Sequence, residues 1–262
     1  MDIFGIIKAC LIVGGTGLLI GVLLGIADKF LAVKKNEQAE KIRELLPGNN
    51  CGGCGFPGCD GLAEAISKNE ASPSACPVGG EAVAKGIGEI LGVSVDVVRK
   101  VAFVKCNGTC EHTTNKYEYS GNMTCVDAVY VSGNGPKSCE YGCLGYGSCV
   151  SVCDRGAINI VNGVAVVDKD KCFACGKCVK ACPKGLIEIV PYDMNYHVAC
   201  SSKDKGKDVK SSCKTGCIGC KICERNCASG AITVEDNLAS IDYDKCTNCG
   251  LCATKCPSKI IM

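Results

Sequence analysis

The sequence predicts an α+β protein that consists of a single N-terminal transmembrane helix followed by small cysteine-rich modules. Three observations support this fold class. The 262 residues include 26 cysteines, no tryptophan and only 5 phenylalanines, so one large hydrophobic core is not expected. A run of 19 uncharged residues lies near the N-terminus. In the C-terminal half, a set of cysteines recurs at one constant offset along the chain.

The uncharged run lies between Lys8 and Asp28 and is close to the roughly 20 residues that span a bilayer as a helix. A secretory signal peptide and a buried core helix are the alternatives. No small-x-small cleavage motif precedes a mature start, and charged, helix-forming sequence follows the run. We therefore expect a retained single-pass anchor. Three glycines repeat every four residues on one of its faces, which fits either a partner helix or the ordinary glycine content of membrane helices: Gly17, Gly21 and Gly25.

The basic residues on either side of the uncharged run predict on which side of the membrane the rest of the chain lies. Only Lys8 precedes the run, whereas five basic residues follow it closely: Lys29, Lys34, Lys35, Lys41 and Arg43. The positive-inside rule then puts the cysteine modules on the cytoplasmic side of the cell (inner) membrane. That compartment is reducing, so the cysteines are expected to be metal ligands rather than disulfides. The formal net charge of +2 gives no support to a nucleic-acid-binding protein.

The chain divides into six predicted segments. They are the transmembrane anchor (1–28), a connecting amphipathic helix (29–46) that ends at Pro47-Gly48, a first cysteine module (47–90), a connector with three further cysteines (91–138), and two repeats (139–190 and 191–262). Each of eight cysteines from Cys139 to Cys182 has a counterpart in the set from Cys213 to Cys256, always at the offset that separates Cys139 from Cys213. We call this constant separation the repeat offset.

The repeats contain the Cys-x2-Cys-x2-Cys-x3-Cys-Pro run of bacterial ferredoxins, in which three thiolates bind one [4Fe–4S] cluster and the fourth reaches its neighbour. The fold class therefore includes two tandem ferredoxin-like modules. In the second repeat we expect one cluster on Cys217, Cys220, Cys223 and Cys256, and another on Cys227, Cys246, Cys249 and Cys252. A four-thiolate zinc site is the alternative, but zinc sites do not normally use such a crossed run.

The first repeat has Tyr146 where the second has Cys220. One cluster is expected on Cys153, Cys172, Cys175 and Cys178. For the other we expect Cys139 to replace the missing ligand beside the flexible Gly142, which gives the set Cys139, Cys143, Cys149 and Cys182. A three-iron cluster that lacks one ligand is the alternative.

The segment NNCGGCGFPGC, with a later ACP, predicts a fifth [4Fe–4S] site in a small helical module, on Cys51, Cys54, Cys59 and Cys76. Glycines in this segment permit the backbone angles that wrap a chain around a cluster. A zinc ribbon would more often show two Cys-x2-Cys pairs, and only one is present.

Six cysteines remain: Cys10, Cys106, Cys110, Cys125, Cys200 and Cys213. Cys10 is expected to be a small apolar residue of the anchor. Cys106, Cys110 and Cys125 could form most of a sixth site, completed by Cys200, Cys213 or His112. Alternatively, Val104-Lys105-Cys106 and Val198-Ala199-Cys200 resemble each other and belong to strands of a repeated element. His112 and His197 are otherwise interpreted as packing residues. The expectation is five clusters, with six as the alternative.

Clusters that are fully ligated by thiolates carry single electrons and leave no position open for substrate. The sequence has no Walker loop and no GxGxxG motif after a strand, and two histidines offer little for catalysis. We therefore expect no catalytic site in this chain and a nicotinamide or flavin site on another subunit. Four lysines of the second repeat either attract an acidic electron carrier or form a solvated loop: Lys203, Lys205, Lys207 and Lys210.

The order of motifs resembles the B subunit of the Rnf complex over nearly the whole chain. These motifs are an N-terminal helix running into IADKFLAV, then LPGNNCGGCGFPGC with a later ACP, then the ferredoxin runs. The segments GPKSCEYGCLGYGSC and CSSKDKGKDVKSSCKTGCIGC are similar to the multi-cluster form of anaerobic bacteria such as clostridia and acetogens. Shorter relatives carry one ferredoxin-like module, so the doubled module departs from that simpler pattern.

The resemblance implies a subunit of a membrane-bound, ion-translocating ferredoxin:NAD+ oxidoreductase. Such a subunit would take electrons from reduced ferredoxin and relay them through [4Fe–4S] clusters to partner subunits that carry flavin and further iron–sulfur centres. The sequence does not decide whether the coupled ion is Na+ or H+. Two alternatives remain: an electron-transfer subunit of another membrane complex, of hydrogenase or formate-oxidising type, and a non-redox scaffold held together by metal.

Overall fold

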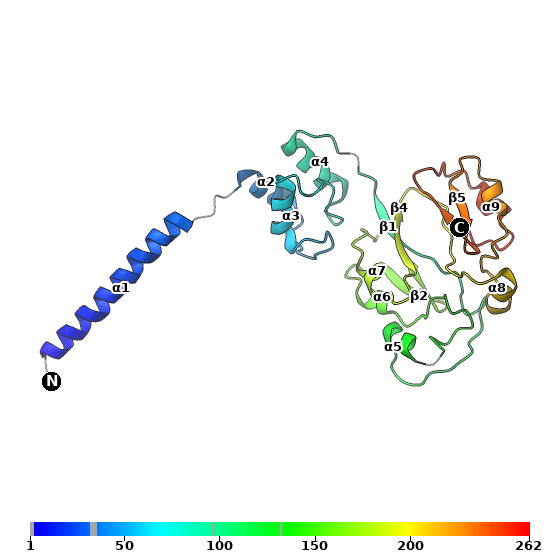
Figure 1. Ribbon diagram of the computed structural model, residues 1–262, viewed down its shortest axis with the longest axis horizontal. Helices are drawn as coiled ribbons and strands as arrows, with labels where there is room; N and C mark the ends of the chain where they lie inside the picture. The colour runs from blue at the N-terminus through cyan, green and yellow to red at the C-terminus, as the bar shows by residue number, and fades with distance from the viewer. Residues whose placement is uncertain (1–2, 32–35, 96, 132) are drawn as a thin grey trace.

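The computed structural model describes residues 3–31, 36–95, 97–131 and 133–262. Figure 1 shows three parts in chain order: one long helix, a small helical module, and a larger body of short helices and strands. The described secondary structure is therefore a mixture of helix and strand, as the sequence predicts for an α+β protein.

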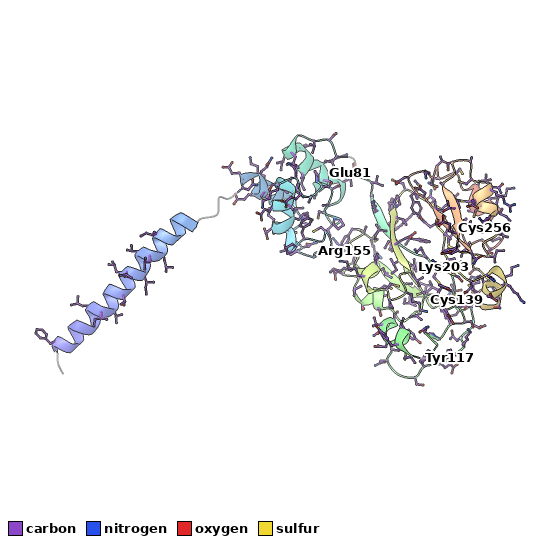
Figure 2. The ribbon with its side chains drawn as sticks, viewed as in Figure 1. Glu81, Tyr117, Cys139, Arg155, Lys203 and Cys256 are labelled. Atoms are coloured by element: carbon purple, nitrogen blue, oxygen red, sulfur yellow. The ribbon has the colours of Figure 1, made fainter. Side chains whose placement is uncertain are left out.

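The long helix α1 (Ile3–Leu31) stands apart from the rest of the chain (Figure 1). Its large apolar side chains between Leu11 and Ile26 are 50 to 72% exposed. A Cβ atom built on Gly17, Gly21 or Gly25 would meet nothing within 4 Å. In Figure 2, the side chains drawn on α1 point outward along its length. Among the described residues, none of the helices combines the length and the apolar character that crossing a membrane requires, so the anchor over 1–28 stays a prediction.

The helical module contains α2 (Glu37–Leu45), α3 (Gly58–Ser67) and α4 (Gly80–Leu91). Helix α2 begins at Glu37 because Asn36 is an extended N-cap whose side-chain oxygen accepts the backbone N–H groups of Gln38 and Ala39. The connecting helix predicted over 29–46 is thus divided between the end of α1 and α2, and residues 32–35 lie outside the described part. Four apolar side chains with at most 1% exposure form the module's core: Ile42, Leu62, Ile66 and Ile87.

In the described residues of the C-terminal body, the strands form three antiparallel two-stranded sheets. Strand β1 (Lys100–Val104) pairs with β4 (Ile187–Pro191), β2 (Ile158–Val161) with β3 (Val164–Val167), and β5 (Ile232–Glu235) with β6 (Leu238–Ile241). The described helices of this body are short: α5 (Cys125–Tyr130), α6 (Ser148–Ser151), α7 (Lys177–Ala181), α8 (Gly206–Ser212), α9 (Ile222–Arg225) and α10 (Leu251–Lys255).

The repeat of the sequence is also a repeat of structure. Elements α6, β2, β3 and α7 of the first repeat recur as α9, β5, β6 and α10 of the second, with bounds displaced by the repeat offset. In each repeat, a short extended segment that precedes the repeated cysteines pairs with the end of the repeat. Val104 at the end of β1 pairs with Ile187, and Val198 pairs with Ile261, which is the counterpart of Ile187 in the second repeat.

The predicted connector 91–138 is therefore not separate from the first repeat. Its strand β1 lies beside β4 (Figure 1), and Ala102 and Val104 belong to the core that the first repeat forms with Ile158, Leu186 and Ile187. The sequence offers, as one alternative, a strand of a repeated element around Val104, but not its pairing with β4, because the two strands lie far apart in the chain.

The two glycines in the middle of α4 provide a test of packing in the helical module. A Cβ atom on Gly88 would lie 2.7 Å from the Val93 carbonyl oxygen, whereas one on Gly86 would lie 3.2 Å from the flexible end of Leu45. We expect Gly88→Ala to lower the free energy of unfolding by about 1 to 3 kcal/mol, because backbone must move to admit the methyl group.

The matched variant Gly86→Ala is expected to be neutral or stabilising by up to about 1 kcal/mol, since alanine favours helix. Urea unfolding under anaerobic conditions measures both. Equal effects of the two substitutions would contradict the packing described for α4.

Candidate metal centres

The helical module gathers the first cysteine set at one end of α3. Cys54, Cys59 and Cys76 pack against the module's core, and Cys51 opens the same glycine-rich loop. The Cys59 amide donates to Asn50 Oδ1 at 2.8 Å, which fixes the start of α3. Burial raises the pKa of the Cys76 thiol. The amides of Gly79 and Val78 oppose this shift, and the neighbouring thiols of Cys59 and Cys54 add to it.

The first repeat brings together the four cysteines predicted for one of its sites. Cys153, Cys172, Cys175 and Cys178 line a hollow with an empty volume of about 380 Å³. Backbone amides point at their sulfur atoms. Ala102 and Ala174 donate to Cys172 Sγ at 3.4 Å, and Ala157 donates to Cys153 Sγ at 3.3 Å.

The second repeat has the equivalent arrangement. Cys217, Cys220, Cys223 and Cys256 line a hollow with an empty volume of about 340 Å³. In the neighbouring set, the thiols of Cys246 and Cys249 lie close enough to Cys252 to add to the rise in its pKa, which burial causes. Cys227 packs against the same core as Cys252. The structure thus groups the first set around one hollow and places three cysteines of the second set close together, with Cys227 in the same core as Cys252. That these cysteines are cluster ligands stays a prediction.

The second hollow of the first repeat differs from the expectation. It is lined by Cys125, Cys143, Cys149 and Cys182, and Cys139 is not among its lining residues. Burial raises the pKa of Cys149 to about 12, and the thiols of Cys143, Cys125 and Cys182 add to the shift. The structure places Cys125, rather than the predicted Cys139, beside the other three thiols.

Cys125 reaches this position because it is the first residue of α5. Thr124 and Asp127 form a capping box that begins the helix, and the Cys125 amide donates to Ser148 Oγ at 3.0 Å beside α6. Tyr146, which replaces a cysteine of the ferredoxin run, packs against the small core around Cys125. Nothing local in the sequence signals this arrangement, because Cys125 lies well before its partners, outside the ferredoxin run.

A further hollow lies between the two repeats. It is lined by Cys106, Cys139, Cys200 and Cys213 and has an empty volume of about 390 Å³. Burial raises the pKa of Cys139 to about 11, and the thiols of Cys106, Cys213 and Cys200 add to the shift. Cys110 is exposed and lines neither this hollow nor the one at Cys125. Of the three cysteines that could form most of a sixth site, Cys106 lines this hollow and Cys125 lines the other, so the trio is not brought together.

These hollows suit thiolate-bound clusters because each offers four thiols, and many of the sulfur atoms accept backbone N–H groups that stabilise their negative charge. The donor set is sulfur in every case. Among the described His, Cys, Asp and Glu side chains, no three are grouped so as to hold a single metal ion. A [4Fe–4S] cube does not require such a group, because each of its four thiolates binds a different iron atom. The side chain of Cys10 lies outside the described part.

The two histidines take part in packing. His197 lies between Phe103, with ring centroids 4.6 Å apart, and Tyr243, whose hydroxyl lies 2.8 Å from His197 Nδ1. His112 Nδ1 lies 3.0 Å from Thr109 Oγ1. The four lysines predicted in a loop do not all lie in one: Lys207 and Lys210 are on α8, and Lys205 is its N-cap. Lys203 is paired with Asp236 at 3.1 Å.

Three known domain families match the chain. A family described as a putative Fe-S cluster matches residues 46–78, a 4Fe-4S binding domain matches residues 165–188, and a 4Fe-4S dicluster domain matches residues 216–260. These matches cover the cysteine-bearing part of the helical module, the second half of the first repeat and most of the second repeat. They support iron–sulfur clusters in each of the three modules.

Three proteins similar to this chain over most of its length are B subunits of ion-translocating oxidoreductase complexes. The B subunit of the ion-translocating oxidoreductase complex of Methanosarcina acetivorans is 47% identical over 258 residues, which cover 98% of this chain and 97% of the relative. The B subunit of the Na+-translocating ferredoxin:NAD+ oxidoreductase complex of Acetobacterium woodii is 48% identical, over 95% of this chain and 75% of the relative. The corresponding subunit of the proton-translocating complex of Clostridium ljungdahlii is 39% identical, over 94% and 88%.

His197 predicts a pH dependence. Burial lowers its pKa, as does Lys169, while the Met194 carbonyl and Glu188 oppose the shift. A depressed histidine pKa stabilises the fold above the unfolded value of about 6.5, and this contribution is lost as the pH falls through the folded pKa. We therefore expect the free energy of unfolding to decrease as the pH falls from about 7 to about 5.

The variant His197→Gln keeps a polar side chain but cannot titrate, so its stability should depend less on pH over this range. Anaerobic urea unfolding of both proteins measures the difference, and acid loss of metal affects both alike. The same slope in the two proteins would show that His197 contributes nothing to the pH dependence.

Proposed function

Because the chain belongs to the family of B subunits of the Rnf complexes, the ion-translocating ferredoxin:NAD+ oxidoreductases, we propose that its thiol-lined hollows form one continuous electron path. Electrons from reduced ferredoxin would enter this iron–sulfur subunit and leave toward partner subunits that carry flavin and further iron–sulfur centres. [4Fe–4S] clusters bound in the hollows would each take up and release one electron. The chain itself supplies the ligands and positions them.

The observation that carries the proposal is the direct contact between successive cysteine sets. At the seam between the helical module and the first repeat, a Cβ atom on Gly53 would lie 3.2 Å from the Cys175 carbonyl oxygen. Within the body, the Cys143 amide donates to Cys106 Sγ at 3.3 Å, and the Cys217 amide donates to Cys200 Sγ at 3.3 Å. Each contact joins the ligand loop of one set to the next set.

The surrounding residues favour reversible reduction at these positions. Nearly all of the thiols are buried or half-buried, which keeps water away from the sulfur atoms. Backbone N–H groups directed at sulfur stabilise added negative charge and change little in position when it arrives. Hydrogen bonding and burial are the levers by which a protein sets the potential of such a site.

We also place the chain at the membrane through α1. The complexes in question are membrane-bound, and the apolar side chains of α1 have large exposed fractions around the helix. Lipid or an apolar partner helix would remove this surface from water. The basic residues that follow the helix put the cysteine modules on the cytoplasmic side.

The anchor is tested by charge. We expect the double variant Leu19→Arg with Leu23→Arg to appear in the soluble fraction, because each arginine at a helix centre disfavours insertion by about 2.5 to 3.5 kcal/mol. Fractionation of cells that express the full chain, followed by immunoblotting, measures the distribution.

The control for this experiment is Tyr130→Arg, which places the same charge on an exposed apolar residue of the body. This variant should remain with the membrane. If the α1 variant also stays in the membrane fraction after a high-salt wash, α1 is not the anchor.

The electron path is tested at Gly53. We expect Gly53→Ala to slow reduction of the sites in the C-terminal body by reduced ferredoxin several-fold, since the methyl group pushes the Cys175 loop away. Stopped-flow absorbance of the purified complex measures the rate.

The control Gly86→Ala makes an equally close contact of 3.2 Å but lies away from the seam, in α4. Its rate should equal that of the unmodified complex. A Gly53→Ala rate equal to the control, with unchanged iron content, would exclude this seam from the path. Absence of any reduction by ferredoxin in the unmodified complex would overturn the proposed function.

A further inference from the structure

We propose that Cys106, Cys139, Cys200 and Cys213 bind a further [4Fe–4S] cluster at the junction of the two repeats. The inference rests on the iron–sulfur function proposed above and extends it to four cysteines outside the recognised motifs. None of the four falls within the ranges that match known domain families, which are 46–78, 165–188 and 216–260. They also come from four separate segments of the chain, with no Cys-x2-Cys spacing among them.

The junction hollow is symmetric, because each repeat contributes an equivalent pair of thiols to it. Cys139 and Cys213 are counterparts, separated by the repeat offset. Cys106 and Cys200 each lie two positions after the valine that pairs with the equivalent isoleucine of its own repeat, Val104 with Ile187 and Val198 with Ile261.

Hydrogen bonds repeat with the same symmetry. Cys106 Sγ accepts the amide of Cys143, and Cys200 Sγ accepts the amide of Cys217, both at 3.3 Å. The two donors are again counterparts at the repeat offset. The hollow is thus formed by two matching halves, one from each repeat, and a cube with four equivalent corners fits such an arrangement.

The local geometry at the sulfur atoms of the junction hollow also resembles that of the ferredoxin runs. In the ferredoxin runs, Cys172 and Cys246 accept an amide from the residue two positions later. In the junction hollow, Cys106 accepts the amide of Gly108 at 3.4 Å in the same way. Burial raises the pKa of the Cys139 and Cys200 thiols, and the amides of Tyr141 and Ser202, each two positions later, oppose this shift. At Cys213 the hydroxyl of Thr215, also two positions later, lies 3.7 Å from the sulfur. These turns hold the sulfur atoms as the turns of the recognised runs do.

The charge of one lining side chain also favours a negatively charged group in the junction hollow. Lys137 lines the hollow and is only 7% exposed. Its ammonium group donates to the carbonyl oxygens of Gly108 at 2.8 Å and Gly163 at 2.7 Å. None of the ion pairs among the described residues includes Lys137. A buried cation is stabilised by a nearby anion, and a cube bound by four thiolates carries net negative charge.

The size of the hollow agrees with this assignment. Its empty volume of about 390 Å³ is close to the 380 and 340 Å³ of the hollows lined by ferredoxin-run cysteines. The junction hollow also lies between the cysteine sets of the two repeats on the proposed electron path. Through Cys106 and Cys200 it touches ligand loops of both repeats, so an electron received from one repeat can be passed to the other without net change at the junction.

The test is metal analysis of the full chain, purified without oxygen. We expect about 24 iron and 24 sulfide per chain, which corresponds to six cubes. The variants Cys200→Ser and Cys213→Ser should each lower both numbers by about four. The matched control Cys110→Ser changes an exposed cysteine beside the same region and should leave both numbers unchanged.

The iron count of the unmodified chain tests the junction cluster even if a variant fails to fold. About 20 iron, with or without one zinc, would overturn the junction cluster while leaving the electron-transfer function intact. Loss of iron in Cys110→Ser equal to that in Cys213→Ser would also overturn it. Little sulfide in any protein would instead contradict the proposed function as a whole.

Discussion

Thiol sulfur atoms occupy much of the interior of this protein, and the rest of its structure depends on this constraint. The cores of both repeats include cysteine side chains among their buried residues. The sheets that support them have two strands of four or five residues, too few to be stable alone in water. Four thiols around an internal hollow need a partner that binds them all, so folding and metal loading are expected to be coupled.

Duplication explains how so many sites fit in a short chain. In the proposed electron path, each repeat would supply two cluster sites, and the junction hollow, to which each repeat contributes two thiols, would add another. The helical module joins the series through the contact of Gly53 with the Cys175 loop. Because neighbouring sets share amide-to-sulfur hydrogen bonds, no separate linker is required between them.

The sequence predicts what depends on local spacing. The ferredoxin runs identify their own ligands because the four cysteines lie close together in the chain, and the repeat offset predicts matching elements in both copies. It could not assign Cys125 or Cys139, because α5 and the junction hollow bring together residues that are distant in the chain. The similarity of Val104-Lys105-Cys106 to Val198-Ala199-Cys200 indicates strands of a repeated element, but it does not identify the partner strand of β1. The alternative sixth site predicted from the sequence includes Cys106 with Cys200 or Cys213, but not Cys139.

The central claim is that the cysteine sets form one continuous path. Electron paramagnetic resonance of the full chain, purified anaerobically and fully reduced with dithionite, tests it most directly. Closely spaced reduced clusters interact magnetically, so the account predicts broadened signals from spin–spin coupling that account for nearly all reduced spins. Sharp, independent signals for most of the spins would contradict it, because they would show sites too far apart to form one path.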